Sequence, residues 1–158
     1  MDAIFKEKSI SATKQEFPSV FRQAIKGFEI ITVNKKSNSK ETVSIISTKH
    51  LEGMIGRAYK FNPVVEADEE GLGYTVALDE VMVFGDGDTL EEAIYDLADN
   101  LLEYTILYFE KPDFYMQIEN RKGHYPYLRR IAGCTDKDEV LGVILECRTD
   151  LLQGILKK

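Results

Sequence analysis

The sequence is poor in the features that mark secreted, membrane-spanning and metal-binding proteins. Its 158 residues include two cysteines, Cys134 and Cys147, which are too few for a disulfide framework and lack the paired spacing of a zinc site. No apolar run approaches the roughly 18 residues that a membrane span requires. The first residues, Met-Asp-Ala-Ile-Phe-Lys-Glu-Lys, do not resemble a secretory signal. We therefore expect a cytoplasmic protein with no metal or other cofactor.

The sequence also lacks the short motifs of common enzyme classes. It contains no Gly-x-Ser-x-Gly turn, phosphate-binding loop or dinucleotide fingerprint. His124 lies near Arg121, Lys122, Arg129 and Arg130, and the spacing places no acid–base partner beside it. This segment is either a catalytic or RNA-contacting cluster or, as we expect, a basic surface patch. No catalytic residue is assigned, and we expect no enzymatic activity.

Charge is distributed unequally along the chain. The apolar fraction of 44% and the charged fraction of 30% are typical of a soluble globular protein, and the net charge is −7. Residues 1–60 sum to +5, whereas residues 61–113 contain 15 acidic side chains and one basic one, Lys111. A basic module suits phosphate groups and an acidic module suits a basic protein. The pattern indicates two kinds of partner, although a solvated acidic face would give the same composition.

An amphipathic helix is predicted near the start of the chain. Apolar residues recur at helical spacing over residues 12–26. Ser11 or Thr13 is suited to cap the start of this helix, and Glu16 would complete a capping box with Thr13. Gly27 follows the last apolar position, as expected at a helix end.

A β-hairpin and a second helix are predicted next. Two β-branched runs, residues 28–33 and 42–46, flank a polar segment and indicate the hairpin. The hairpin tip is basic, and the second helix begins after Ser47. The basic residues at the tip are Lys35, Lys36 and Lys40.

The first 57 residues or so resemble the DNA-binding domain of Phd/YefM antitoxins. Phe17 and Gly27 match the family's helix in type and spacing, and Lys14 stands where the family has an arginine. The two hairpin strands match as Ile30-Ile31-Thr32 and Val43-Ser44-Ile45-Ile46-Ser47.

The resemblance implies DNA binding by a homodimer. A module of this size buries little surface alone, and dimerisation is a common remedy. A two-fold dimer presents paired helix starts and hairpin tips to DNA about one helical turn apart. The residues that we expect to contact DNA are Ser11, Thr13, Lys14, Lys35, Lys36 and Lys40.

Residues 58–113 predict three strands followed by a long helix. The strands are expected from Tyr59 to Ala67, over residues 74–78 and over residues 81–84, and the helix is expected to end near Glu110. Thr89 and Glu92 have the spacing of a capping box. Asp86, Asp88 and the nearby glutamates could suggest a divalent metal site, but their spacing differs from that of a calcium loop and helix capping explains them.

This second segment looks like a HicB-type antitoxin domain. The matching motifs are Gly73-Tyr74-Thr75-Val76 and Gly87-Asp88-Thr89-Leu90-Glu91-Glu92-Ala93. In that family the domain covers the active site of a small basic RNase toxin. The same two-part chain also fits the antitoxin of a RelE/RelB-type system, so the resemblance implies a basic, RelE-like toxin as partner. Residues 58–113 would either face this toxin or stabilise the dimer.

The remaining residues, 114–158, predict short helices with apolar stripes. In Phd/YefM antitoxins the region after the DNA-binding domain binds the toxin, and a plain packing role explains such stripes equally well. The residues that we expect to contact a partner are Glu91, Glu92, Leu151, Leu152 and Ile155.

Together these patterns predict an α+β protein with three parts. Residues 1–57 form a Phd/YefM-like DNA-binding and dimerisation domain, residues 58–113 a HicB-like β-β-β-α acidic module, and residues 114–158 a helical tail. The predicted function is that of a type II antitoxin, which neutralises a cognate toxin and represses its own operon. The alternative is a partner- or ligand-binding module that does not bind DNA.

Overall fold

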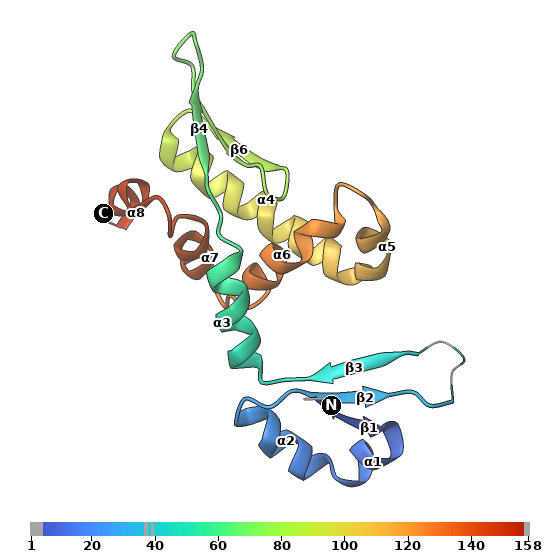
Figure 1. Cartoon of the computed structure of the whole chain (residues 1–158). Coiled ribbons are helices and arrows are strands. Elements are labelled where there is room, and N and C mark those ends of the chain that lie inside the picture. The colour runs from blue at the N-terminus through green and yellow to red at the C-terminus, as the bar shows by residue number, and fades with distance from the viewer. Residues whose placement is uncertain (1–4, 37, 39, 157–158) are drawn as a thin grey trace. The chain divides into compact units, whose positions relative to one another are not determined.

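The protein is α+β, as expected, and divides into two compact units (Figure 1). The computed structural model describes residues 5–36, 38 and 40–156. The first unit is Met1–Met54 and the second is Ile55–Lys158. Each unit contains one small three-stranded sheet.

The first unit combines its sheet with short helices. Strand β2 lies in the centre of the sheet, parallel to β1 and antiparallel to β3. Helix α3 begins in this unit, and its last turn belongs to the second unit. The elements are β1 (Lys6–Ser9), α1 (Ile10–Gln15), α2 (Phe17–Ile25), β2 (Ile30–Val33), β3 (Thr42–Ile45) and α3 (Thr48–Ala58).

The single helix expected over residues 12–26 is two helices, and its expected cap is wrong. Glu16 leaves the helical conformation between α1 and α2, with φ −102° and ψ 14°. Pro18 lies in the first turn of α2 and has no N–H to continue the hydrogen bonding of α1, which accounts for the break. Ser9 caps α1 by accepting a hydrogen bond from the Ala12 amide at 3.2 Å. The Glu16 carboxylate pairs with Lys8 instead of closing a capping box.

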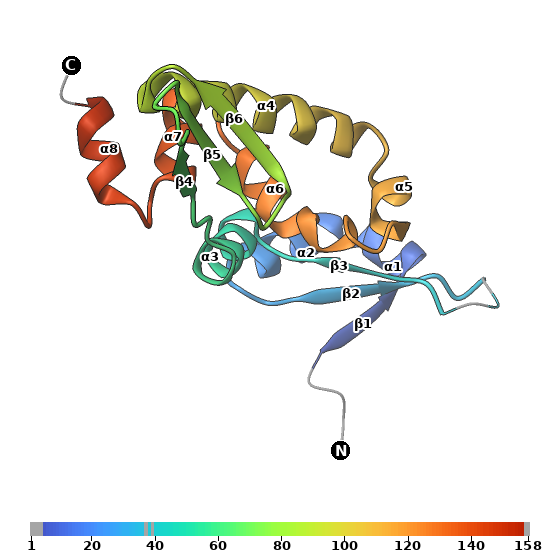
Figure 2. The same cartoon turned by 90° about the horizontal axis from the view of Figure 1, so that it is seen from above.

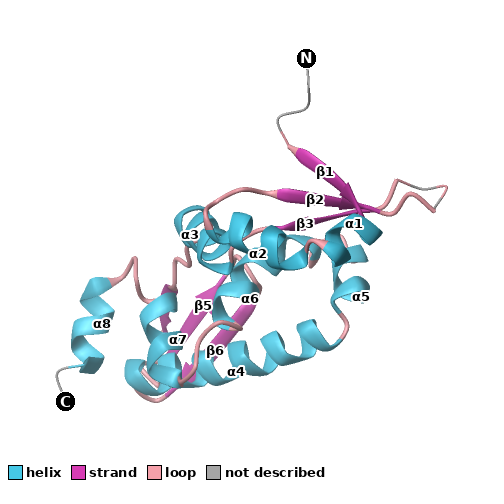
Figure 3. Cartoon of the chain, turned by 90° about the horizontal axis from the view of Figure 1, so that it is seen from below, coloured by secondary structure: helices cyan, strands magenta, loops and turns pink. Residues whose placement is uncertain are grey.

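The second unit places a β-meander against a long helix. Strand β5 is central and antiparallel to both β4 and β6. The views from above and below show the sheet with α4 on one of its faces (Figure 2, Figure 3). The elements are β4 (Val64–Ala67), β5 (Tyr74–Leu78), β6 (Val83–Gly87), α4 (Leu90–Glu110), α5 (Pro112–Gln117), a 3-10 turn (Lys122–His124), α6 (Tyr125–Ile131), α7 (Lys137–Ile144) and α8 (Thr149–Leu156).

Three of the expected strand boundaries in this unit are wrong, and one of them is the end of the third strand, which lies at Gly87 and not at residue 84. The third strand begins at Val83, because Val81 closes a turn by donating its N–H to the Leu78 carbonyl and Met82 has a φ of +56°. That positive φ is incompatible with a strand. The first strand begins at Val64 and not at Tyr59, since the Tyr59 and Pro63 carbonyls accept from Arg130 and Arg148 and do not pair with β5.

Helix α4 has the predicted boundaries and the predicted cap. Thr89 accepts from the Glu92 amide, and the Glu92 carboxylate accepts from the Thr89 amide, which completes the capping box. Strand β6 approaches this helix very closely at two glycines. A Cβ on Gly85 would lie 2.1 Å from the Leu97 nitrogen, and one on Gly87 would lie 2.4 Å from the Ala93 nitrogen. Gly85 and Gly87 are therefore required for sheet–helix packing, because a side chain at either position would collide with the backbone of α4.

The core of the second unit joins the sheet, α4 and the C-terminal helices. Val76 and Leu78 of β5 point toward α4, and Leu128, Ile131 and other apolar residues of α6 and α7 pack into the same cluster. The helical tail is therefore part of this core. In the first unit the described core is small and consists of Val20, Ala24 and Ile30, with Ile45 packed against them.

Candidate DNA and partner interfaces

The tip of the β2–β3 hairpin presents exposed lysines. Lys35 and Lys36 are exposed in the turn after β2. Asn34 fixes the base of this loop, because its side chain accepts from the Lys36 amide and donates to Glu41 at 2.9 Å. Lys40 is also exposed and lies 3.7 Å from the carboxylate of Glu7. The hairpin therefore holds two lysines in solvent on an ordered base, which suits contact with phosphate groups.

The other residues expected at DNA lie on α1 and differ in accessibility. Ser11 and Lys14 are exposed. Thr13 is buried, with 7% of its surface exposed, and its hydroxyl is 2.9 Å from that of Thr32 on β2. In this arrangement the Thr13 side chain joins α1 to the sheet and is not available to a phosphate.

Apolar side chains are exposed on α2 of the first unit. Phe17, Phe21 and Ile25 are spaced four residues apart, so they share one face of the helix, and they are 50%, 55% and 62% exposed. Val43 on β3 is also exposed. Exposed apolar stripes of this kind mark interaction surfaces.

The start of α4 carries the predicted acidic contacts. The Glu92 carboxylate closes the capping box, whereas Glu91 is half-buried at the side of a hollow of about 230 Å³. The facing wall of the hollow comes from α8 and includes Leu151 and Ile155. Asp86, a weak candidate for a metal ligand by sequence, accepts from the Thr75 hydroxyl. Among the described residues no group of three or more His, Cys, Asp or Glu side chains could hold a metal ion.

The apolar stripe of α8 packs against the core. Leu151, Leu152 and Ile155 are each half-buried against the main cluster of the second unit. The packing role that the sequence left open for this stripe is therefore present in the structure. A partner at this position would contact the parts of these side chains that stay exposed around the hollow.

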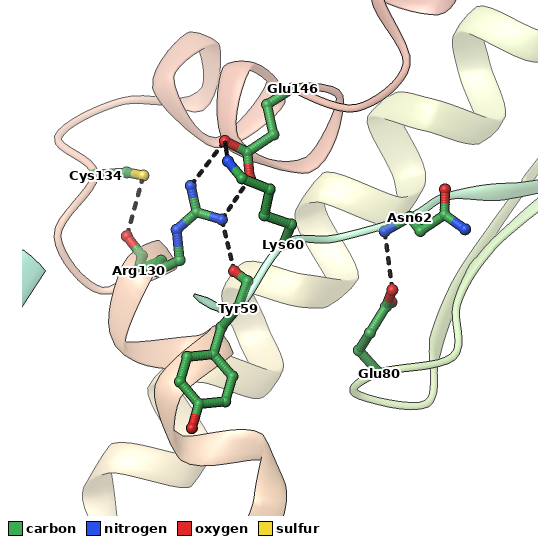
Figure 4. Close-up of polar contacts among 7 residues, drawn as sticks. All are labelled: Tyr59, Lys60, Asn62, Glu80, Arg130, Cys134 and Glu146. Atoms are coloured by element: carbon green, nitrogen blue, oxygen red, sulfur yellow. Dashed lines mark hydrogen bonds and ion pairs between the residues drawn. The ribbon is translucent and has the colours of Figure 1, made fainter. Parts of the chain in front are cut away.

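A polar cluster joins the segment after α3 to the C-terminal helices (Figure 4). Arg130 of α6 donates to both carboxylate oxygens of Glu146, at 2.6 and 3.1 Å, and to the Tyr59 carbonyl at 2.8 Å. Lys60 adds a third donor to Glu146 at 3.1 Å. Burial raises the pKa of Glu146, but the hydrogen bonds from Arg130 and Lys60 outweigh it and hold that pKa below its usual value.

The polar cluster around Arg130 is not apparent from the sequence. Arg148 extends it by donating to the Pro63 carbonyl at 3.0 Å. Its members are distant in sequence, with Arg130 and Tyr59 71 positions apart. No sequence motif joins these positions, because Glu146 pairs with Arg130 and Lys60, whereas Arg148 pairs with Asp150.

His124 belongs to the interior and not to a surface patch. It is 4% exposed, and its Nδ1 lies 2.8 Å from the Tyr104 hydroxyl. Burial lowers the pKa of His124, and the charge of Arg121 lowers it further. The Arg121 guanidinium lies over the Tyr104 ring, 5.1 Å from its centroid. This arrangement makes His124 part of the aromatic cluster at the end of α4.

The fold is shared with an antitoxin of known structure. A crystal structure from Syntrophomonas wolfei subsp. wolfei, described as the antitoxin part of a proposed toxin/antitoxin system, superposes with a TM-score of 0.73. The superposition covers 87% of this chain and 95% of that chain, at 20% sequence identity. At this identity the likeness is one of fold. No curated protein matches the chain in sequence.

The family follows from the sequence itself. Residues 4–146 match the PHD_like family, described as "Antitoxin of toxin-antitoxin, RelE / RelB, TA system". The match spans most of the chain, and the protein belongs to this family of antitoxins. In the described part of the chain, no helix is both long and apolar enough to cross a membrane.

Proposed function

We propose that this antitoxin neutralises a cognate toxin and represses its own operon by binding DNA as a homodimer in the cytoplasm. The first unit and the start of the second would act as a Phd/YefM-like module over residues 1–57. Residues 58–113 would act as a HicB-like acidic module, and the helical tail of residues 114–158 would supply the rest of its core. The observation that carries the proposal is the family match together with the separation of an exposed basic hairpin tip from an acidic second unit.

Homodimer formation would cover the apolar stripe on α2. Phe17, Phe21 and Ile25 stay exposed, whereas Val20 and Ala24 of the same helix are buried. A second copy presents the same stripe, so a two-fold interface is self-complementary. The dimer would also double the number of lysines available to one stretch of DNA.

DNA contact would be made chiefly by Lys35, Lys36, Lys40 and Lys14, with Ser11 beside them. These side chains are exposed, whereas Thr13 is buried and is therefore not proposed as a DNA contact. Lysine–phosphate contacts release counterions, so binding should weaken steeply as salt rises.

The toxin would be a small basic protein of RelE-like type that binds the acidic second unit. The sequence-derived contacts Glu91, Leu151 and Ile155 surround one hollow, and Leu152 lies on the same helix. The Glu92 carboxylate accepts a hydrogen bond in the capping box of α4, so Glu92 would attract the toxin by its charge while keeping this hydrogen bond.

A gel shift on the protein's own upstream DNA, across a salt series, tests the DNA role. We expect a specific complex that the Lys35→Glu/Lys36→Glu variant abolishes. In milder variants such as Lys35→Gln/Lys36→Gln, the salt slope should fall by about 0.9 for each phosphate that the protein no longer neutralises. The matched control, Lys111→Glu/Lys122→Glu, makes the same change of charge on the second unit and should leave binding intact. A folded wild-type protein that does not bind at low salt would contradict the DNA role and favour a module that binds only a partner protein.

A further inference from the structure

The two edges of the sheet in the second unit differ. Strands β4 and β6 each pair with β5 on one side, so each has a second edge with backbone groups that face away from the sheet. Unpaired edges invite another strand, and proteins normally cover them.

The edge of β6 is covered by side chains of α4. Asp96 accepts a hydrogen bond from the Asp86 amide at 3.0 Å, and Asn100 donates to the Phe84 carbonyl at 3.0 Å. Asn100 also donates to Asp96 at 3.1 Å, which fixes both side chains. The outward-facing donor of Asp86 and acceptor of Phe84 are therefore satisfied within the unit.

The edge of β4 is covered at its beginning and open afterwards. The Asp68 amide donates to the Gly73 carbonyl. In an antiparallel ladder every second residue bonds to the neighbouring strand, so Glu66 and Val64 are the residues of β4 that bond to β5. The backbone groups of Val65 and Ala67 therefore face outward. The Pro63 carbonyl also faces outward, and Arg148 donates a hydrogen bond to it. No described residue is hydrogen-bonded to the outward N–H and C=O groups of Val65 or Ala67.

The surroundings of this edge are acidic. A hollow of about 510 Å³ extends from the end of β4 across β5 to the end of β6 and is lined by four carboxylates, of which Glu66 and Asp68 lie on the β4 side. None of the four forms an ion pair with a described cation. The carboxylates are Glu66, Asp68, Asp86 and Asp88. Two copies of this edge would repel each other, whereas an extended segment with basic side chains would meet opposite charge.

We propose that the cognate toxin docks on the open edge of β4 by adding an extended basic segment as a fourth strand of this sheet. Its main chain would pair with the N–H and C=O groups of Val65 and Ala67, and a basic side chain would lie beside Glu66. Strand addition of this kind derives affinity from the main chain and specificity from alternate side chains. The position is continuous with the start of α8, through Arg148, and so with the sequence-derived partner contacts. This inference rests on the proposed function, because it names where the toxin binds.

Amide hydrogen exchange provides the most direct test. The probe is the protein encoded by the open reading frame that adjoins this gene, mixed with the full-length isotope-labelled antitoxin. In the free protein the amides of Val65 and Ala67 should exchange fast while that of Glu66 is already protected. In the complex, Val65 and Ala67 should become protected, with little change at Glu66. A complex that forms without this alternating protection would overturn the docking site and leave the toxin role standing.

Substitution at Ala67 separates the edge from the rest of the surface. Ala67→Pro removes the outward N–H and obstructs an added strand, while the β4–β5 pairing does not use that N–H. We expect binding of the same neighbouring protein to weaken by about tenfold or more. Ala67→Ser keeps the N–H and should bind as the wild type does. Protection of the Glu66 amide in the free Ala67→Pro variant confirms that its sheet is intact.

The outcomes distinguish the two proposals. Equal binding by wild type, Ala67→Pro and Ala67→Ser overturns the edge and keeps the toxin role. If the wild type itself does not bind the neighbouring protein, both the toxin role and the docking site are overturned. If β4 edges of two antitoxin copies pair with each other, Val65 and Ala67 will be protected in the free protein, which also overturns the proposal.

Discussion

The two units bury apolar side chains to very different extents. Among the described residues, three buried side chains form the cluster of the first unit, whereas sixteen form that of the second. The first unit instead exposes large apolar residues on α2, including Phe17 and Phe21. The second unit therefore has a large apolar core of its own, whereas the first leaves apolar side chains that contact with another surface would cover. This difference agrees with the proposal that the two units have different partners.

The placement of tyrosines makes this difference measurable. All eight tyrosines lie in the second unit, from Tyr59 to Tyr127, and the chain has no tryptophan. Tyrosine fluorescence therefore follows the unfolding of the second unit alone, while far-ultraviolet circular dichroism follows both units. The two signals together show which unit a substitution affects.

The largest effect is expected at Gly85, where the second unit has no space for a side chain. In Gly85→Val the Cβ would lie 2.1 Å from the Leu97 nitrogen and 2.5 Å from the Ala93 oxygen, both backbone atoms. We expect a loss of about 3 kcal/mol or more in the free energy of unfolding, because β6 must separate from α4. Denaturant titration followed by tyrosine fluorescence measures it. Gly142→Ala in α7, where nothing lies within 4 Å of the new Cβ, should stabilise the same unit by about 1 kcal/mol.

The next effect concerns the incomplete first unit. If the α2 stripe forms the dimer interface, Phe21→Glu removes an apolar contribution of about 2 kcal/mol per protomer and adds a charge there. The protein should become monomeric in sedimentation equilibrium, and the circular dichroism transition of the first unit should lose its dependence on protein concentration. Phe114→Glu is the matched control, because Phe114 is 56% exposed but lies in the second unit. Equal dimerisation by the Phe21→Glu and wild-type proteins would show that the stripe has another role.

A smaller effect is expected from the cluster that attaches residues 59–63 to the C-terminal helices. Arg130→Met leaves the half-buried Glu146 with Lys60 as its remaining partner, at a cost of about 2 kcal/mol. The tyrosine transition should shift and the transition of the first unit should not. Lys122→Met removes an exposed ion pair with Glu119 and should change stability by less than about 0.5 kcal/mol. If the two variants lost similar amounts of unfolding free energy, the partly buried Arg130–Glu146 pair would stabilise the protein no more than the exposed Lys122–Glu119 pair does.

The smallest effect is a pH dependence of the second unit. The pKa of His124 is lowered in the folded state by burial and by Arg121, so below about pH 6.5 the unfolded chain binds a proton that the folded chain does not. The free energy of unfolding should therefore fall as pH drops from 7.5 to 5.5, by about 1 kcal/mol or less. His124→Gln should remove this slope. The lowered pKa of Glu146 acts in a lower window, below about pH 4.5, where protonation of its carboxylate removes the stability gained from Arg130 and Lys60.

Features encoded by neighbouring residues were predicted well from the sequence. The bounds of α4, its capping box at Thr89 and Glu92, and the strand at Tyr74–Leu78 agree with the structure. These depend on periodicity and capping within a few residues, so no distant partner is needed to specify them.

Features that depend on distant residues were missed or misplaced. The burial of Thr13 requires Thr32 across the sheet, and the Arg130 cluster joins Tyr59, Lys60 and Glu146 from separate elements. The failure to predict the helix break at Glu16 was a local error, because Pro18 is tolerated only in the first turn of a new helix. The difference between the covered edge of β6 and the open edge of β4 likewise depends on Asp96, Asn100 and Arg148, which no strand pattern reveals.

The central claim is that the two units bind different partners, and one paired binding measurement tests it. Fluorescence anisotropy would give the affinities of wild type, Lys35→Glu/Lys36→Glu and Ala67→Pro for the upstream DNA and for the protein encoded by the adjoining open reading frame. We expect the hairpin variant to lose DNA and keep the protein partner, and Ala67→Pro to keep DNA and bind the protein partner about tenfold more weakly or worse. Loss of both partners by either folded variant, or of neither by both, would contradict the division of function between the units.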